Sequence, residues 1–482
     1  MKANLIGGRW LDGTQALDNV NPSDIGDIID TYALADTAQV ACAMEAAAAA
    51  FGEWSLSTPQ QRFDVLDGIG AEILARKAEL GDLLAREEGK TLPEAIGEVA
   101  RAGQIFKFFA GEALRTGGET LPSVRPDIRV EVTREPIGVV GIITPWNFPI
   151  AIPAWKIAPA LAYGNCVVFK PAEAVPGSAW ALTEIIARSA LPAGAFNLVM
   201  GQGAEVGPAM LNDANLSGLT FTGSVATGRR IAAAALTRDA GMPKLQLEMG
   251  GKNAFVVLND ADIDNAVHCA IQSAFYSTGQ RCTAASRLIV ADGIHDKFVR
   301  ALVEKMAALN VGDARDPATH IGPVVDERQL EQDLRYVALG KEEGATLVSG
   351  GELLRTSTQG KRGHYFRPAL FTETHNAMRI NQEEIFGPVA TVQRVKGYEE
   401  ALAIVNDSSL GLVAGICTTS LRHATHFKRH AQTGMVMVNV PTAGVDYHVP
   451  FGGRKGSSYG PREQGRYAVD FYTTVKTSYI GA

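Results

Sequence analysis

The chain has 482 residues, of which 46% are hydrophobic and 20% charged, and its formal net charge is −7. This length exceeds the size at which a single hydrophobic core stops growing, so two or more domains are expected. No Lys/Arg-rich run is present, which argues against a nucleic-acid-binding protein. The most apolar stretch, residues 137–157, is interrupted by prolines and Lys156, which argues against a membrane span.

The cysteine content and the N-terminus point to a cytoplasmic protein. The N-terminal residues lack the apolar core of a signal peptide. The five cysteines are odd in number and widely spaced, which disfavours a disulfide framework and favours a reducing compartment. No Cys or His pair has the spacing of a zinc site, so no metal is expected.

The N-terminal part of the chain has a helical pattern. Residues 36–52 are rich in Ala and follow Asp36, a good helix cap. Residues 59–89 and 93–116 continue the helical pattern.

From residue 138 onwards, strands and helices are predicted to alternate. Residues 138–143 form a continuous apolar run that ends at Thr144-Pro145, which is typical of a buried strand. Further strand-like runs, each followed by a helical segment, are 166–169 before 177–190, 195–200 before 203–212, and 219–221 before 225–236. This order predicts a parallel sheet with helices on its faces, and a second α/β series spans residues 254–438.

Two segments suggest strands outside those sheets. Residues 129–134 alternate polar and apolar side chains, as in a half-exposed strand. Residues 468–477 are rich in β-formers and would make an isolated final strand unless they pair elsewhere. Pairing with another subunit is one way to cover that edge.

Two glycine-rich turns are weak candidates for phosphate binding. Residues 201–207 contain one residue too many for GxGxxG, and residues 223–228 have P-loop spacing but continue with Arg229 and Arg230. These departures argue against a Walker nucleotide site. A glycine at a strand-to-helix turn can still present backbone N–H groups to an anion, although an ordinary turn glycine is the commoner explanation.

Cys282 lies among small or polar residues. Cys166 has apolar neighbours instead, which indicate a cysteine buried in the hydrophobic core. The adjacent Arg281 would favour a reactive thiolate. Free cysteines are often buried and structural, so the residues alone leave both interpretations of Cys282 open.

Glu248 lies between apolar residues and before a Gly pair. Burial of this carboxyl would raise its pKa towards the range of a general base, whereas the alternative is an edge-strand Glu that faces water. Asn147 lies among two prolines and two aromatic residues, where its amide could donate to an oxyanion; a rigid packing loop is the alternative.

Seven segments taken together resemble the aldehyde dehydrogenase superfamily over nearly the whole chain. In order, they are Thr144–Pro149, Lys170–Glu173, Phe221–Ser224, Leu247–Lys252, Gly279–Cys282, Glu383–Val389 and Pro450–Gly453. The resemblance implies an α/β fold with a Rossmann-like cofactor domain, a second parallel α/β catalytic domain and a small β oligomerisation arm. The expected ranges are 1–128 with 139–247, then 248–440, and 129–138 with 466–482, and the arm implies a dimer or tetramer.

The resemblance also implies roles for individual residues in aldehyde oxidation. Cys282 resembles the nucleophile, Glu248 the general base, and Asn147 with the backbone N–H of Cys282 the oxyanion hole. Lys156 and Glu463 match positions proposed to relay protons.

A nicotinamide cofactor follows from the same resemblance. The residues expected to contact it are Thr144, Trp146, Lys170, Glu173, Gly203, Ser224, Met249, Glu384 and Phe386. Glu173 can accept hydrogen bonds from both ribose hydroxyls and would repel a 2′-phosphate, which favours NAD. Lys170 could offset that repulsion, so NADP stays open.

The expected substrate is a small carboxylated aldehyde. The loop Ser457-Ser-Tyr-Gly-Pro-Arg-Glu463 is similar to that of the α-ketoglutaric semialdehyde (2,5-dioxopentanoate) dehydrogenases of bacterial sugar-acid breakdown. A carboxylated substrate needs a cationic anchor, for which Arg281 is the candidate. The other residues expected to contact the substrate are Phe148, Trp155 and Phe451.

Other activities remain as alternatives. They are oxidation of succinate semialdehyde or of a broad range of aldehydes, acyl transfer to coenzyme A, and a non-catalytic binding or structural role on the same fold. Glu248 argues for hydrolysis and against acyl transfer to coenzyme A, and the set of Cys282, Glu248 and Asn147 argues against a non-catalytic role.

Overall fold

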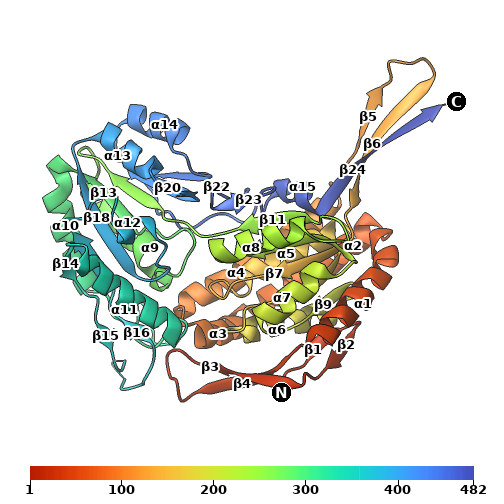
Figure 1. Ribbon diagram of the computed structural model, residues 1–482, viewed down its shortest axis with the longest axis horizontal. Coiled ribbons are helices and arrows are strands. Elements are labelled where there is room, and N and C mark those ends of the chain that lie inside the picture. Colours follow the sequence, from red (N-terminus) through yellow and green to blue (C-terminus); the bar gives the residue numbers. More distant parts are fainter. Residues whose placement is uncertain (358, 482) are drawn as a thin grey trace.

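The chain forms two α/β lobes, and a β arm projects from one of them (Figure 1). A computed structural model describes residues 1–357 and 359–481. Within these residues, no helix is both long enough and apolar enough to cross a bilayer.

The first lobe is built on an eight-stranded sheet. In spatial order its strands are β2 (Arg9–Leu11), β1 (Asn4–Ile6), β9 (Phe196–Leu198), β8 (Cys166–Lys170), β7 (Val139–Ile143), β10 (Leu216–Thr222), β11 (Lys244–Glu248) and β23 (Ser458–Tyr459). The five strands from β9 to β11 pair in parallel, which confirms the predicted sheet.

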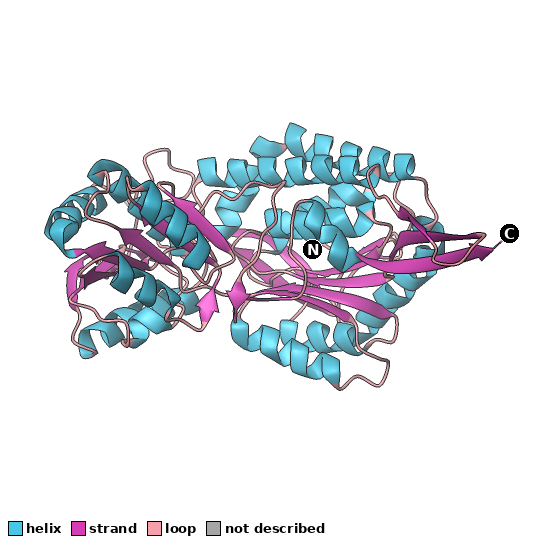
Figure 2. Cartoon of the chain, turned by 90° about the horizontal axis from the view of Figure 1, so that it is seen from above, coloured by secondary structure: helices cyan, strands magenta, loops and turns pink. Residues whose placement is uncertain are grey.

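Helices cover both faces of this sheet (Figure 2). They are α1 (Thr37–Ser55), α2 (Pro59–Ala75), α3 (Lys77–Glu88), α4 (Leu92–Ala113), α5 (Ala151–Ala162), α6 (Pro176–Ala187), α7 (Gly203–Asn212) and α8 (Val225–Leu236). The Asp36 side chain accepts a hydrogen bond from the N–H of Gln39 at 2.9 Å, which confirms it as the cap of α1.

Two features of these helices differ from the prediction. The prediction of one continuous helix over residues 59–89 is wrong, because Arg76 departs from the helical backbone conformation and separates α2 from α3. Helix α5 was not predicted, because prolines interrupt its sequence. Pro153 lies in the first turn, where a proline removes no intrahelical hydrogen bond, and every residue of α5 is buried.

The second lobe contains a seven-stranded sheet, which confirms the second α/β series. In spatial order its strands are β14 (Thr346–Ser349), β17 (Ala369–Thr372), β18 (Val389–Val395), β13 (Arg287–Ala291), β12 (Ala254–Val257), β20 (Val413–Cys417) and β21 (Met435–Val438). Only the β14 edge pair is antiparallel. Its helices are α9 (Ile263–Ala274), α10 (Asp292–Ala307), α11 (Glu327–Glu342), α12 (Arg379–Gln382), α13 (Tyr398–Asn406) and α14 (Leu421–His430).

Three two-stranded ribbons complete the lobes. They are β3 (Gln15–Val20) with β4 (Ile28–Leu34), β15 (Leu353–Leu354) with β16 (Tyr365–Phe366), and β19 (Leu410–Gly411) with β22 (Arg454–Lys455).

The arm is a three-stranded antiparallel sheet in the order β24 (Thr473–Gly481), β6 (Ile128–Pro136) and β5 (Glu119–Pro122). The final strand is not isolated, because β24 pairs along its whole length with β6 of its own chain. Strand β5 pairs with β6 although residues 119–122 fall inside the range expected for the cofactor domain.

The segment before β24 is helical and not extended. It forms the short helices η2 (Arg466–Ala468) and α15 (Val469–Tyr472). Phe471 and Tyr472 are fully buried against the first lobe, and this packing overrides the local β propensity.

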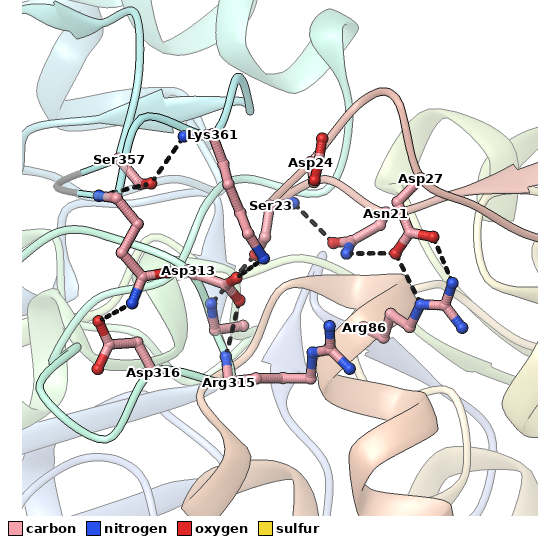
Figure 3. Close-up of polar contacts among 12 residues, drawn as sticks. Asn21, Ser23, Asp24, Asp27, Arg86, Asp313, Arg315, Asp316, Ser357 and Lys361 are labelled. Carbon is pink, nitrogen blue, oxygen red and sulfur yellow. Dashed lines mark hydrogen bonds and ion pairs between the residues drawn. The ribbon is translucent and has the colours of Figure 1, made fainter.

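The N-terminal segment Asn21–Asp27 joins the two lobes (Figure 3). On the side of the first lobe, Arg86 of α3 forms an ion pair with Asp27. On the other side, the Ser23 hydroxyl accepts a hydrogen bond from the N–H of Ala314 at 3.1 Å. These contacts fix the relative position of the lobes, and the cavity described next lies between them.

Candidate active site

A cavity of about 240 Å³ lies next to Cys282 and is lined by residues of both lobes. Phe148, Trp155 and Phe451 line it, and the rings of Trp155 and Phe451 stack with centroids 5.5 Å apart. Arg281 also lines it. The structure therefore brings together all four residues that the sequence suggested for substrate contact, beside the proposed nucleophile.

The backbone before Cys282 has an unusual conformation. Ser277 and Thr278, in the turn η1 (Tyr276–Gly279), have positive φ angles of 50° and 55°. The Glu94 carboxylate of α4 accepts hydrogen bonds from the backbone N–H and the hydroxyl of Ser277, at 2.9 and 3.0 Å. Such strained residues persist where surrounding contacts hold them, and here they set the position of Cys282.

The thiol of Cys282 is protonated at neutral pH. Burial, with the nearby carboxylates Glu384 and Glu248, raises its pKa to about 12, whereas the backbone N–H groups of Cys282 and Thr283 oppose the shift. Arg281 and the Cys282 thiolate attract each other, as expected, because the charge of Cys282 raises the pKa of Arg281, but burial and the two carboxylates outweigh this attraction. A base must remove the proton before the sulfur can attack.

Glu248 ends strand β11 and is only 2% exposed, so the alternative of an edge-strand carboxylate facing water is wrong. The hydroxyl of Ser458, on the neighbouring strand β23, donates to Glu248 Oε2 at 2.5 Å. Burial and the charge of Glu463 raise the pKa of Glu248 well above its ordinary value, while the Ser458 hydrogen bond lowers it. A buried carboxyl with a raised pKa is suited to accept a proton near neutral pH.

Asn147 lies beside the segment that leads to Cys282. Its Nδ2 donates to the carbonyl oxygen of Gln280 at 2.9 Å. Lys90 stabilises the loop that carries Asn147. Its Nζ donates to the Asn147 carbonyl oxygen at 2.8 Å and forms an ion pair with Glu98 at 2.6 Å. Sequence inspection missed Lys90, since no local pattern marks a lysine that acts on a loop 57 residues away.

Lys156 and Glu463 form a buried ion pair. Lys156 Nζ also donates to the hydroxyl of Thr220 at 2.7 Å. The negative charge of Glu463 raises the pKa of Glu248, so the ion pair lies close enough to influence the Glu248 carboxyl.

A second cavity, of about 510 Å³, lies where β7, β8 and β10 meet helices α7 and α8. Lys170 and Glu173 line it and form an ion pair at 3.0 Å, and the Gly203 N–H donates to Glu173. A Cβ atom at Gly203 would lie only 3.3 Å from Glu173, so glycine keeps this approach open. Ser224 caps the start of α8, one turn from the lining residue Thr227.

The remaining residues expected to bind the cofactor form a group closer to Cys282. Glu384 accepts a hydrogen bond from the N–H of Gly251 at 2.8 Å, and burial raises its pKa to about 7. The rings of Trp146 and Phe386 meet edge to face with centroids 5.4 Å apart.

Two more of the residues expected to contact the cofactor are Met249 and Thr144. Met249 packs with Phe221 under α8, close to Gly228. The Thr144 hydroxyl is buried and, among the described residues, has no hydrogen-bond partner. The second cavity and the Glu384 group thus offer both a ribose acceptor and an aromatic surface, which fits a dinucleotide.

Known proteins resemble the chain over its full length. Residues 10–478 match the model of the aldehyde dehydrogenase family. The chain is 42% identical over 480 residues to the α-ketoglutaric semialdehyde dehydrogenase of Bacillus subtilis, covering 99% of this chain and 97% of the relative. It is 38% identical over 479 residues to the 2,5-dioxopentanoate dehydrogenase of Saccharolobus solfataricus, covering 99% and 98%.

The fold agrees with these similarities. The crystal structure of betaine aldehyde dehydrogenase from Staphylococcus aureus in complex with NAD+ superposes with a TM-score of 0.96 at 33% identity, covering 100% of this chain and 95% of the other. The chain therefore belongs to the aldehyde dehydrogenase family, whose members oxidise aldehydes to carboxylic acids with NAD(P)+.

Proposed function

We propose that this enzyme oxidises 2,5-dioxopentanoate to 2-oxoglutarate, with Cys282 as nucleophile and Glu248 as general base. The observation that carries the chemistry is that Cys282 lies at an aromatic-lined cavity, where burial raises the pKa of its thiol, near the buried carboxyl of Glu248, whose pKa is also raised. The substrate follows from the full-length similarity to the B. subtilis and S. solfataricus enzymes and from the cationic lining of the cavity.

In the first step, the Cys282 sulfur adds to the aldehyde carbon as its proton passes to a carboxylate, for which Glu248 is our candidate. The aldehyde oxygen becomes an oxyanion, which Asn147 Nδ2 and the Cys282 N–H stabilise in our assignment. Bound NAD(P)+ supplies the acceptor for the hydride that the aldehyde carbon loses.

In the second step, water hydrolyses the thioester on Cys282. Glu248 removes a proton from that water, and Ser458 holds the carboxylate in place for it. We assign the Lys156–Glu463 pair to proton transfer behind Glu248, because the charge of Glu463 acts on it.

We assign cofactor binding to the second cavity and to the Glu384 group. Glu173 and Lys170 would hold the adenosine ribose, and Glu384 the ribose of the nicotinamide half. The carboxylate of Glu173, which Lys170 holds in an ion pair, favours NAD over NADP, because a 2′-phosphate would face this carboxylate.

Arg281 lines the cavity and is one candidate for binding the substrate carboxylate. Its Nη2 donates to the carbonyl oxygen of Gln272, which keeps the guanidinium at the cavity wall. The same side chain would suit succinate semialdehyde, so that substrate is the main alternative.

An aldehyde panel with the purified protein tests the proposal. It compares 2,5-dioxopentanoate, succinate semialdehyde, glutaraldehyde, betaine aldehyde and benzaldehyde, each with NAD+ and NADP+. The highest kcat/KM is expected for 2,5-dioxopentanoate with NAD+, and 2-oxoglutarate should form at the same rate with and without coenzyme A. A higher kcat/KM for another aldehyde would refute the substrate, and a requirement for coenzyme A would refute hydrolysis by Glu248.

We also propose that the arm mediates a homodimer or homotetramer. The arm strands leave Val475, Tyr479 and Ile480 exposed, together with Leu121 of β5. Exposed apolar side chains on a projecting sheet are typical of an interface. Light scattering of the purified protein tests this.

A further inference from the structure

The cavity next to Cys282 is lined by hydrogen-bond donors that lack acceptors. Arg101 Nε, Trp155 Nε1 and Arg281 Nε are all buried, and none has a partner among the described residues. Buried donors without partners are costly, and proteins avoid them unless a ligand completes them. The cavity therefore fits a ligand with several acceptor oxygens close together.

Arg101 extends from α4 and is held in a fixed orientation. Its Nη2 donates to Gln464 Oε1 at 3.0 Å, and its guanidinium lies 5.5 Å from the centroid of the Trp155 ring. Gln464 is itself fully buried, with a positive φ of 59°. Gln464 and the Trp155 ring thus fix the orientation of this guanidinium, and its Nε has no acceptor among the described residues. Such a group is preorganised to bind an anion.

Among the described residues, no carboxylate is hydrogen-bonded to Arg101, although the charges of Glu98 and Asp446 act on it. Glu98, one helical turn away, has both oxygens engaged. One pairs with Lys90 at 2.6 Å, and the other accepts the backbone N–H groups of Ile150 and Ala151 at the start of α5. The cavity lining as a whole holds three cationic side chains against two carboxylates.

Arg281 and Arg101 differ in how they are held. Arg281 donates to the Gln272 carbonyl, and the charge of Glu94 acts on it. Arg101 donates to the Gln464 amide, the charges of Glu98 and Asp446 act on it, and its guanidinium also lies against the Trp155 ring. Of the two guanidinium groups, Arg101 is therefore the one fixed by two neighbouring side chains, which preorganises it to bind a carboxylate.

We propose that Arg101 is the main ligand of the substrate carboxylate, with Trp155 Nε1 and Arg281 Nε donating to the remaining oxygens of a 2-oxo acid end. The aldehyde end then faces Cys282, and the stacked rings of Trp155 and Phe451 cover the methylene groups between the two ends. This inference rests on the proposed function, namely that the substrate is a carboxylated aldehyde.

The variant Arg101→Met tests it by comparing 2,5-dioxopentanoate with pentanal, an uncharged aldehyde of the same length. For 2,5-dioxopentanoate the KM should rise by about tenfold to a hundredfold, the effect of losing a hydrogen-bonded ion pair. For pentanal both KM and kcat should stay unchanged. Arg101→Lys keeps the charge but not the planar donors, and should fall between the wild type and Arg101→Met.

Two matched variants serve as controls. Lys107→Met removes a half-exposed cation of the same helix that pairs with Asp67 of α2 instead of lining the cavity, and should change neither KM. Arg281→Met removes the second guanidinium of the cavity and should raise the KM for 2,5-dioxopentanoate less than Arg101→Met does.

The outcomes separate the two proposals. If the wild type does not prefer 2,5-dioxopentanoate to pentanal, the proposed substrate fails. If the wild type has that preference and Arg101→Met keeps it, Arg101 is not the anchor. Equal losses with pentanal would likewise overturn the inference, because they would make Arg101 a structural residue.

Discussion

The hydroxyl of Ser458 is predicted to control thioester hydrolysis through Glu248. In Ser458→Ala, Glu248 Oε2 loses its 2.5 Å hydrogen bond, and the Gly453 N–H loses its acceptor at 2.6 Å. Because the Ser458 hydrogen bond lowers the pKa of Glu248, its removal raises that pKa further. Less of the carboxylate is then ionised at neutral pH, and the remainder is less well oriented towards water.

The size of the effect follows from the type of bond. A hydrogen bond to a charged group contributes about 1.5–3 kcal/mol, which corresponds to about 10- to 150-fold in rate if it acts fully on hydrolysis. A base works only when ionised, so activity is lost as the pH falls through its pKa. The acid limb of the kcat profile should therefore move to higher pH in Ser458→Ala.

Stopped-flow measurement of NADH separates the two chemical steps. Both the rate of the first-turnover burst and the steady-state rate should fall in Ser458→Ala, because we assign Glu248 to deprotonation of Cys282 as well as to hydrolysis of the thioester. Ser458→Thr restores a hydroxyl and should recover most of the rate. Ser457→Ala removes a buried hydroxyl of the same loop that bonds Gly250 and Gly411 instead of Glu248, and should leave the acid limb in place. An unshifted acid limb in Ser458→Ala, or the same shift in Ser457→Ala, would refute the reasoning.

Three further predictions concern the thiol, the cofactor and the arm. Glu384→Gln removes a charge that raises the pKa of Cys282, so iodoacetamide should alkylate Cys282 faster at about pH 8; an unchanged rate would contradict this. Glu173→Gln removes the carboxylate that would face a 2′-phosphate, so kcat/KM for NADP+ relative to NAD+ should rise about tenfold, and an unaltered ratio would count against Glu173 as the discriminating group. Deletion of residues 473–481 removes the whole ladder to β6 and should reduce the mass of the assembly in light scattering, whereas an assembly of the same mass would show that the arm is not its interface.

The sequence by itself determined the features that depend on neighbouring residues. The Asp36 cap and the alternating strands and helices of both sheets are confirmed, because capping and hydrophobic periodicity act over a few residues. The family is also confirmed, since each of its motifs is a contiguous segment. The misjudged segments are those where packing overrides local preference, as in the proline-containing α5 and the buried turn of α15.

Only the tertiary structure decided the electrostatics of the site. Sequence proximity suggested that Arg281 would lower the pKa of Cys282, yet the carboxylates that act on it come from segments distant in the chain, and burial adds to their effect. Ser458 meets Glu248 across 210 residues, and Arg101 meets Gln464 across 363. Charge and hydrogen bonding depend on distance in space and on exclusion of water, and neither quantity can be obtained from the order of residues along the chain.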